Sequence, residues 1–290
     1  MITLLNVTAL VTIMLAMGMQ VRFEAVMAST RPLHRVGLGL LANYVLVPIV
    51  TLGLLYLFRA NPMVSVGFFV LAVCPGAPVG PPATTIARGN VAWAIGMMVI
   101  LAGLSAFLSP ALLGVLLAQL VPQSDLHIDY LAIARTLLIA QMLPLALGLA
   151  IHHWAPQVTQ WIAKPLGMIG NVLLLALVVA IVATQYETLA AIRLRGWTGM
   201  SLLLLASLGL GWLCGGADVG VRKAMAVTTA SRNVAVGLII VTSNFADSPA
   251  VTAVVAYGLL SIVGTFGCAL LFRKFTAGGT REPLAGGTTP

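Results

Sequence analysis

CPGAPVGPP, residues Cys74 to Pro82, stands in the middle of an apolar run that is long enough to cross a bilayer as a helix. Its nine residues include four prolines and two glycines. Proline lacks a backbone N–H and clashes with the preceding turn, so the pattern predicts a broken helix, with a merely kinked helix as the alternative. Irregular backbone at membrane depth persists only where protein or a water-filled cavity covers it. The stretch therefore points to the interior of a membrane protein.

A second unusual stretch, VTTASRNVAV (Val227–Val236), places a serine, an arginine and an asparagine side by side within the apolar run 224–245. At about 1.5 Å of rise per residue, Arg232 falls within roughly 5 Å of the bilayer midplane. An isolated arginine at that depth costs at least ~2.5 kcal/mol on insertion scales. A charge kept at such a cost is a candidate functional residue.

The composition predicts a polytopic, all-α membrane protein. Of 290 residues, 60% are hydrophobic and 8% are charged, and the mean hydropathy is +1.06. A soluble domain carries roughly 25% charged residues. The basic residues behind the net charge of +8 are scattered between apolar runs, which favours membrane topology over nucleic-acid binding.

Nine apolar runs are expected to cross the bilayer. Their approximate bounds are 2–20, 34–58, 63–87, 91–120, 130–152, 166–186, 197–216, 224–245 and 248–272. The first is interpreted as a retained span, because no basic segment precedes it as in a cleaved signal. The runs form a single transmembrane unit, 1–275, with a first repeat over about 1–120 and a second over about 128–275. A disordered cytoplasmic tail is expected over 276–290.

The placement of Lys and Arg predicts the orientation. One set of alternating loops, with the C-terminal region, holds ten basic residues: Arg22, Arg31, Arg35, Arg88, Lys164, Arg222, Lys223, Arg273, Lys274 and Arg281. The opposite loops hold three, which are Arg59, Arg193 and Arg195. Because basic residues concentrate in cytoplasmic loops, we expect a protein of the cell (inner) membrane with its N-terminus outside and its C-terminus in the cytoplasm.

The two unusual stretches occupy corresponding positions in the two halves when spans one to four are laid over spans six to nine. Span five is then an additional helix, and the odd offset gives the halves opposite topology. Interrupted segments at corresponding positions of inverted halves are typical of secondary transporters with a site near the midplane.

CPGAPVGPPATTIARGN (74–90) and TTASRNVAVGLIIVTSNF (228–245) resemble the bile acid:sodium symporter family. The resemblance runs from the first span through the ninth, and the span count is similar to members that lack the first helix. It implies a core domain and a panel domain, with two discontinuous helices crossing inside the core. It also implies transport of a small organic anion by alternating access.

The resemblance further implies positions for bound sodium, and most oxygen ligands are missing from them. The sodium positions of the family align with Gly80, Pro81, Ala94, Met98, Thr228 and Arg232, while the adjacent Asn233 is retained. A cation beside a fixed guanidinium would also be repelled. We therefore expect no cofactor, no metal site of the usual kind and no strong sodium coupling.

The candidate substrate or crossing-site residues are the polar and helix-breaking residues of the two stretches, with one asparagine at matching places in each half: Arg232, Asn233, Ser231, Thr228, Thr229, Gly76, Pro78, Gly80, Pro81, Thr84, Thr85, Asn6 and Asn171. Every acid lies in or near a loop or tail, so we expect Arg232 to take the place of bound sodium and bond to carbonyls of the broken helices. A direct contact with substrate and a purely structural bridge both remain open. The hydroxyls could instead bond to their own helices, and the asparagines either line the cavity or join helices.

An enzyme is not expected, because the spans contain no HExxH motif, paired carboxylates or Ser–His arrangement. A channel for anions and a non-transporting receptor or scaffold are the alternatives to a transporter. Broken helices in an inverted repeat favour alternating access. The substrate, the driving ion and the oligomeric state are left open by the sequence.

Overall fold

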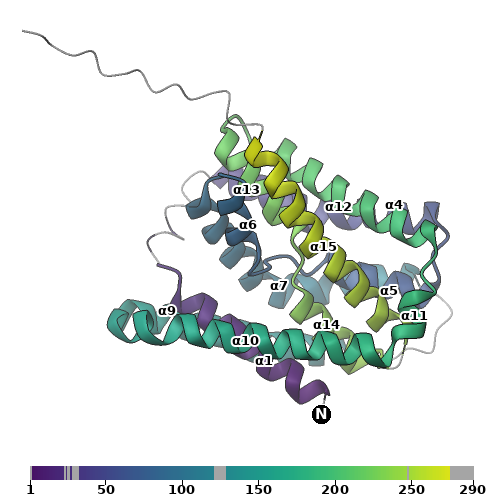
Figure 1. Cartoon of the computed structure of the whole chain (residues 1–290), viewed down its shortest axis with the longest axis horizontal. Coiled ribbons are helices and arrows are strands. Elements are labelled where there is room, and N and C mark those ends of the chain that lie inside the picture. Colours follow the sequence, from purple (N-terminus) through teal and green to yellow (C-terminus); the bar gives the residue numbers. More distant parts are fainter. Residues whose placement is uncertain are drawn as a thin grey trace, which may run out of the picture.

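The computed structural model describes residues 2–22, 24, 27, 33–120, 129–246 and 248–274, and these residues form helices joined by short turns (Figure 1). In chain order the elements are α1 (Ile2–Met19), α3 (Leu33–Leu41), the π-helix η1 (Ala42–Leu46), α4 (Val47–Leu57), α5 (Pro62–Ala72), α6 (Gly80–Ile86), α7 (Val91–Leu120), α8 (Tyr130–Leu137), the π-helix η2 (Leu138–Met142), α9 (Leu143–Trp154), α10 (Pro156–Thr184), α11 (Tyr186–Ala190), α12 (Leu194–Cys214), α13 (Val219–Ala230), α14 (Val234–Asn244) and α15 (Pro249–Lys274). The predicted tail, 276–290, lies outside the described residues.

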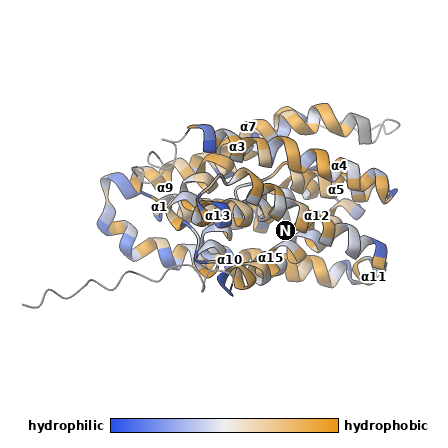
Figure 2. Cartoon of the chain, turned by 90° about the horizontal axis from the view of Figure 1, so that it is seen from above, coloured by the Kyte–Doolittle hydropathy of each residue, from blue (hydrophilic) through white to orange (hydrophobic). Residues whose placement is uncertain are grey.

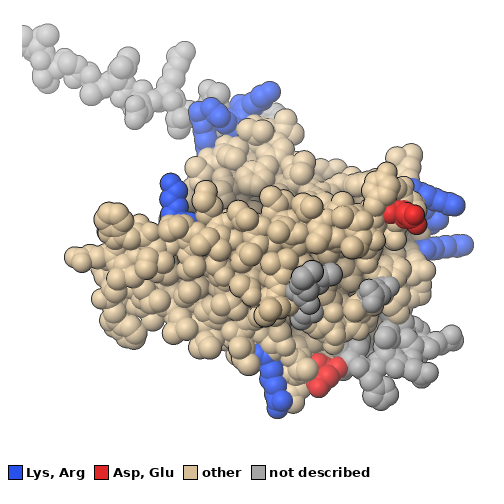
Figure 3. Space-filling view, turned by 60° about the horizontal axis from the view of Figure 1, so that its bottom comes forward, with Lys and Arg blue, Asp and Glu red and all other residues tan. Residues whose placement is uncertain are grey.

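The all-α, polytopic membrane architecture is confirmed. Within the described part of the chain, seven helical runs are long and apolar enough to cross a membrane, and two shorter apolar helices accompany them. Hydrophobic residues run along most of the helices, and hydrophilic residues gather toward helix ends (Figure 2). One broad face carries almost no charge at its centre, and its Lys, Arg, Asp and Glu side chains stand around the margin (Figure 3). This is the distribution that a bilayer selects.

Both predicted interruptions are present as true breaks in helices. The third span consists of α5 and α6, separated by residues 73–79, so the alternative of a kinked continuous helix is wrong. The eighth span consists of α13 and α14, separated by residues 231–233. The last turn of α5 and the last turn of α13 therefore end inside the protein, where their carbonyl groups need partners.

Two predicted boundaries are wrong in an instructive way. Helix α10 begins at Pro156 instead of residue 166, because proline is well suited to the first helical position and Pro165 is accommodated within the helix. Helix α13 begins at Val219 instead of residue 224, with Asp218 as its N-cap. This second shift brings Lys223, which the topology argument assigned to a loop, inside a helix, where the residue is 1% exposed.

Spans two and five each contain a π-helical turn just before a proline. In η1 the N–H of Val47 donates to the carbonyl of Ala42, and in η2 the N–H of Leu143 donates to that of Leu138. The prolines that follow, Pro48 and Pro144, have no N–H to continue the α-helical ladder. Neither π-turn was predicted.

Helices α1, α9 and α10 lie together along one side of the molecule (Figure 1). Glycines allow α1 and α9 to approach closely: a Cβ at Gly18 would lie 2.3 Å from the carbonyl oxygen of Leu145, and one at Gly148 would lie 2.3 Å from that of Leu15. The remaining long helices pack around α13 and α14, whose span is buried over its central part. The division into a core and a panel domain, and the repeat boundaries, stay predictions.

Candidate functional site

The first break is shaped by a glycine that no other residue could replace without strain. Gly76 has a φ of +84°, a conformation that residues with a side chain rarely adopt. A Cβ at this position would also lie 2.5 Å from the backbone nitrogen of Ala102 on α7. The break therefore lies directly against the α7 backbone, and Gly76 permits both the turn and the close approach.

Three consecutive carbonyls at the end of α5 each find a partner from another element. The carbonyl oxygen of Ala72 accepts from Nη1 of Arg232 at 3.1 Å, and that of Val73 accepts from Oγ of Ser109 at 2.5 Å. The carbonyl oxygen of Cys74 accepts from the backbone N–H of Asn233 at 2.9 Å. The two breaks therefore touch, and the second one supplies two of the three donors.

The second break is formed by three polar residues, each with a local task. Oγ of Ser231 donates to the carbonyl of Val227 at 2.8 Å and closes the end of α13. Asn233 begins α14, because its Oδ1 accepts from the N–H of Val236 at 3.3 Å. Arg232, between them, extends its side chain to the other broken helix.

The guanidinium of Arg232 joins the C-terminal ends of the two broken helices. Its Nη1 donates to Ala72, the last residue of α5, and its Nη2 donates to the carbonyl of Thr229 in the last turn of α13. Arg232 is 1% exposed. A helix C-terminus carries a partial negative charge and unpaired carbonyls, so a cation placed between two of them is stabilised by both.

No acid neutralises this charge within the described part of the chain. Among the described residues, the ion pair between Arg22 and Glu24, at 3.8 Å, lies outside the crossing. Groups of His, Cys, Asp and Glu that could hold a metal ion are absent from the described residues. Backbone carbonyls are thus the observed partners of Arg232, as expected from the sequence, and its Nε has no acceptor among described residues.

The four predicted threonines are in three different situations. Oγ1 of Thr84 donates to the carbonyl of Gly80, and Oγ1 of Thr85 to that of Pro81, so both hydroxyls return to their own helix. Thr229 instead accepts from Nδ2 of Asn43 at 3.2 Å, and this contact ties span two to the crossing. Oγ1 of Thr228 is buried without a partner among the described residues.

The residues that the resemblance assigned to bound sodium offer few oxygen ligands. Ala94 and Met98 are buried apolar side chains, and Gly80 and Pro81 have no side-chain oxygen. A Cβ at Gly80 would lie 3.7 Å from Oγ1 of Thr228, which is the one hydroxyl of this set. One hydroxyl beside a guanidinium does not fit the several oxygen ligands that a hard cation requires.

The two matching asparagines do not join the crossing. Asn6 is buried on α1 and its Nδ2 donates to Oγ1 of Thr242 on α14 at 3.4 Å. Asn171 is exposed on α10, where it lines a hollow of about 420 Å³ with Gln20 and Lys164. The first residue joins two helices, and the second faces outward. Pro78 lies in the turn before α6, and Pro81 in the first turn of α6.

Several polar residues of the site were missed in the sequence. Asn43 contacts Thr229, Ser109 contacts Val73, and Nε2 of Gln141 donates to Oγ of Ser105 at 2.7 Å. All four of Asn43, Ser105, Ser109 and Gln141 are fully buried. Their signal was an uncharged polar residue inside a long apolar run, which is itself a mark of helix–helix contact or function in membranes.

A second buried cation, Lys223, joins another pair of helix ends. Its Nζ donates to the carbonyl of Ala87, which caps α6, at 2.8 Å, and to that of Phe272 in the last turn of α15 at 3.0 Å. The arrangement resembles that of Arg232, with a fixed cation between two helix C-termini. The third span is therefore bonded to the eighth span twice, at the end of α5 by Arg232 and at the end of α6 by Lys223.

Comparison with known proteins gives a family and several distant relatives. Residues 7–192 match the model of the Sodium Bile acid symporter family. The chain is 25% identical over 238 residues to a probable chloroplastic sodium/metabolite cotransporter, BASS2, of Oryza sativa subsp. japonica, covering 81% of this chain and 56% of the relative. It is 24% identical over 252 residues to the uncharacterized sodium-dependent transporter YocS of Bacillus subtilis (strain 168), covering 84% and 75%. It is 23% identical over 203 residues to the ileal sodium/bile acid cotransporter of Cricetulus griseus, covering 70% and 58%.

Proposed function

The chain belongs to the sodium bile acid symporter family, and from that premise we propose that it is a secondary transporter that carries a small organic anion across the membrane by alternating access. The family is one of transporters, so an enzymatic activity is not proposed. The chain spans 56% of the length of the rice relative, so its substrate and its coupling are argued from its own residues.

The observation that supports the proposal best is the contact between the two broken helices. Secondary transporters build their sites from discontinuous helices whose ends meet inside the protein, where half-helix C-termini bind the coupling cation. Here the C-termini of α5 and α13 bind the guanidinium of Arg232 instead. We infer that this arginine takes the structural place of bound sodium, and that transport requires little or no sodium.

This inference runs against the names of the relatives, which describe sodium-dependent proteins. It depends on charge, because a fixed cation at the crossing disfavours a second cation nearby. The repulsion energy between two unit charges 4 Å apart is roughly 4 kcal/mol at an effective dielectric constant of 20. Facilitated diffusion and anion exchange are both compatible with such a site.

The experiment is uptake into proteoliposomes. Labelled bile acid, the substrate named for the ileal relative, is compared with smaller labelled organic anions that raise the melting temperature of the purified protein. We expect saturable uptake whose rate changes less than twofold when sodium is replaced by choline at fixed pH and potential. A large, saturable stimulation by sodium would contradict the role proposed for Arg232. Binding of an anion without any uptake would instead favour a receptor.

A further inference from the structure

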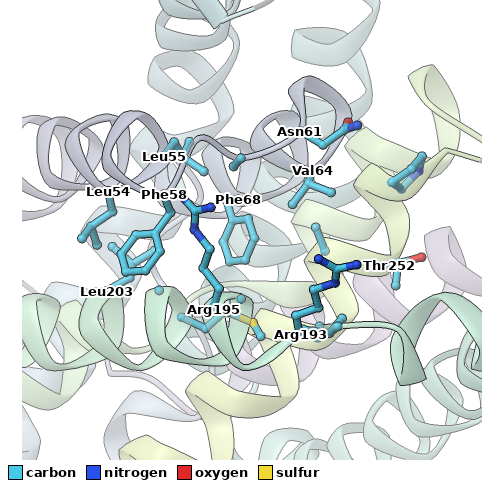
Figure 4. A pocket seen from close by; sticks show the side chains of 18 of the residues that line it. Leu54, Leu55, Phe58, Asn61, Val64, Phe68, Arg193, Arg195, Leu203 and Thr252 are labelled. Atoms are coloured by element: carbon cyan, nitrogen blue, oxygen red, sulfur yellow. The ribbon is translucent and has the colours of Figure 1, made fainter.

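The three basic residues of the predicted outer loops line one cavity. Arg59 follows α4, Arg193 precedes α12 and Arg195 lies in its first turn, and all three line a cavity of about 550 Å³. We call them the outer arginine cluster. In Figure 4, the side chain of Arg195 rises between Phe58 and Phe68, and that of Arg193 points into the space below Val64.

The body of this cavity is apolar. Its walls include Leu54, Leu55, Phe58, Val64, Phe68 and Leu203, from α4, α5 and α12 (Figure 4). Polar groups other than the arginines are few, and they include Asn61 and Thr252. A cavity of several hundred Å³ with apolar walls and a few convergent polar groups is typical of a site for a small ligand.

The positive charges of the outer arginine cluster are not neutralised by ion pairs with described residues. No described acid forms an ion pair with any of its three members, although Glu187 lies on α11, next to the lining residue Thr188. The guanidinium carbon of Arg195 lies 5.9 Å from the centroid of the Phe58 ring, so an aromatic face holds this side chain beside the apolar wall. Positive charge therefore borders directly on apolar surface.

We propose that this cavity binds an amphipathic organic anion, with its oxyanion head at the outer arginine cluster and its apolar body against the walls. Arginine suits this task because its planar fork bonds carboxylate, sulfonate or phosphate oxygens in pairs. Basic residues are scarce in the outer loops of such proteins, and here the three basic residues of the predicted outer loops line one cavity. Binding of an anion in this cavity does not depend on the proposed function. Only the identification of this ligand with the transported anion rests on it.

The site is separate from the helix crossing but adjoins it. Phe68 forms part of the wall, and its ring centroid lies 5.6 Å from that of Tyr257. Tyr257 is buried on α15, which packs against both α5 and α14. The cavity therefore adjoins α5, the helix that ends at the first break, on the predicted outer side of the protein.

The test is equilibrium binding of labelled cholate, a steroid carboxylate, to the full chain in nanodiscs of neutral phosphatidylcholine. We expect saturable binding, and at least tenfold weaker competition by the uncharged methyl ester of cholate. Replacing the cluster (Arg59→Gln, Arg193→Gln, Arg195→Gln) should weaken cholate binding at least tenfold and remove the preference over the ester. Val64→Trp, which fills the cavity and leaves the charges, should also weaken binding at least tenfold.

The matched control removes three cations elsewhere on the protein: Arg35→Gln, Arg135→Gln and Lys164→Gln. This control should bind cholate like the unchanged protein. Equal loss in the control and in the cluster variant would overturn the proposal, because membrane charge alone would then explain the effect. Undiminished binding in a cluster variant that melts normally would also overturn it.

A lipid headgroup could supply the same chemistry, and a second set of nanodiscs distinguishes this source. If phosphatidylglycerol is the occupant, it should displace cholate from the unchanged protein and be retained by it in native mass spectra, and the cluster variant should retain none. No saturable binding of either cholate or phosphatidylglycerol would overturn the proposal. Because binding is measured without a gradient, it can succeed or fail independently of uptake.

Discussion

At the scale of the residue, Arg232 shows how a buried charge can be held without an acid. Its two terminal nitrogens each reach a carbonyl oxygen at the end of a different helix, so one side chain satisfies two groups that a broken helix leaves unpaired. The planar guanidinium matters here, because it presents two separate nitrogens to the two carbonyls. A lysine ammonium is a single, compact group and does not reach the same two acceptors in the same geometry.

Substitution of Arg232 separates its structural role from a role in substrate recognition. We expect Arg232→Gln to lower the free energy of unfolding by about 2–4 kcal/mol without ligand, because buried carbonyls lose charged donors. Arg232→Lys should lose less, since it keeps the charge. Melting of the purified protein, followed by uptake, measures both effects. Arg135→Gln on α8, an exposed position, is the control and should melt normally.

A different outcome would assign a different role. If Arg232→Gln melts like the unchanged protein and loses only ligand-induced stabilisation, the arginine recognises the anion rather than joining the helices. Normal melting together with normal uptake in both variants would contradict either role.

At the scale of the element, the sequence predicted the breaks but not how their ends are satisfied. Clustered Pro and Gly residues in 74–82 were sufficient to locate the first break, because their backbone chemistry acts locally. The partner of each freed carbonyl depends on helix packing, so Ser109 and Asn43 could not be assigned from local pattern. The start of α13 was also placed too late, because hydropathy does not reveal that the segment with Arg222 and Lys223 is helical and that Lys223 is buried.

Lys223 lies in the part of α13 that was predicted to be a loop. Its replacement tests how much its hydrogen bonds to the ends of α6 and α15 stabilise the protein. We expect Lys223→Met to lower the free energy of unfolding by about 2–4 kcal/mol, because the carbonyls of Ala87 and Phe272 lose a charged donor in a buried position. The measurement is melting of the purified protein. Lys164→Met, the same change at an exposed position on α10, should have little effect. Equal stability of the two variants would show that the Lys223 contacts are dispensable.

At the scale of the whole molecule, the structure changes the charge count behind the predicted orientation. Lys223 is buried, so nine of the ten basic residues assigned to the cytoplasmic side remain against three on the outer side. Those three surround one cavity, which gives a reason for basic residues where topology disfavours them. Charge counting thus predicted an asymmetry from the sequence, but only the fold could bring Arg59 next to Arg193 and Arg195, which lie far away in the chain.

Labelling of single cysteines in intact cells tests this orientation. The three native cysteines, Cys74, Cys214 and Cys268, are first replaced by alanine. Glu187→Cys on α11 and Lys164→Cys near the start of α10 then place thiols at exposed positions toward opposite ends of one span. Because the distribution of basic residues predicts that Lys164 lies on the cytoplasmic side, an impermeant maleimide should label position 187 in intact cells and position 164 only after permeabilisation. The reverse pattern would invert the protein in the membrane and place the outer arginine cluster on the cytoplasmic side, where its position would need no functional explanation.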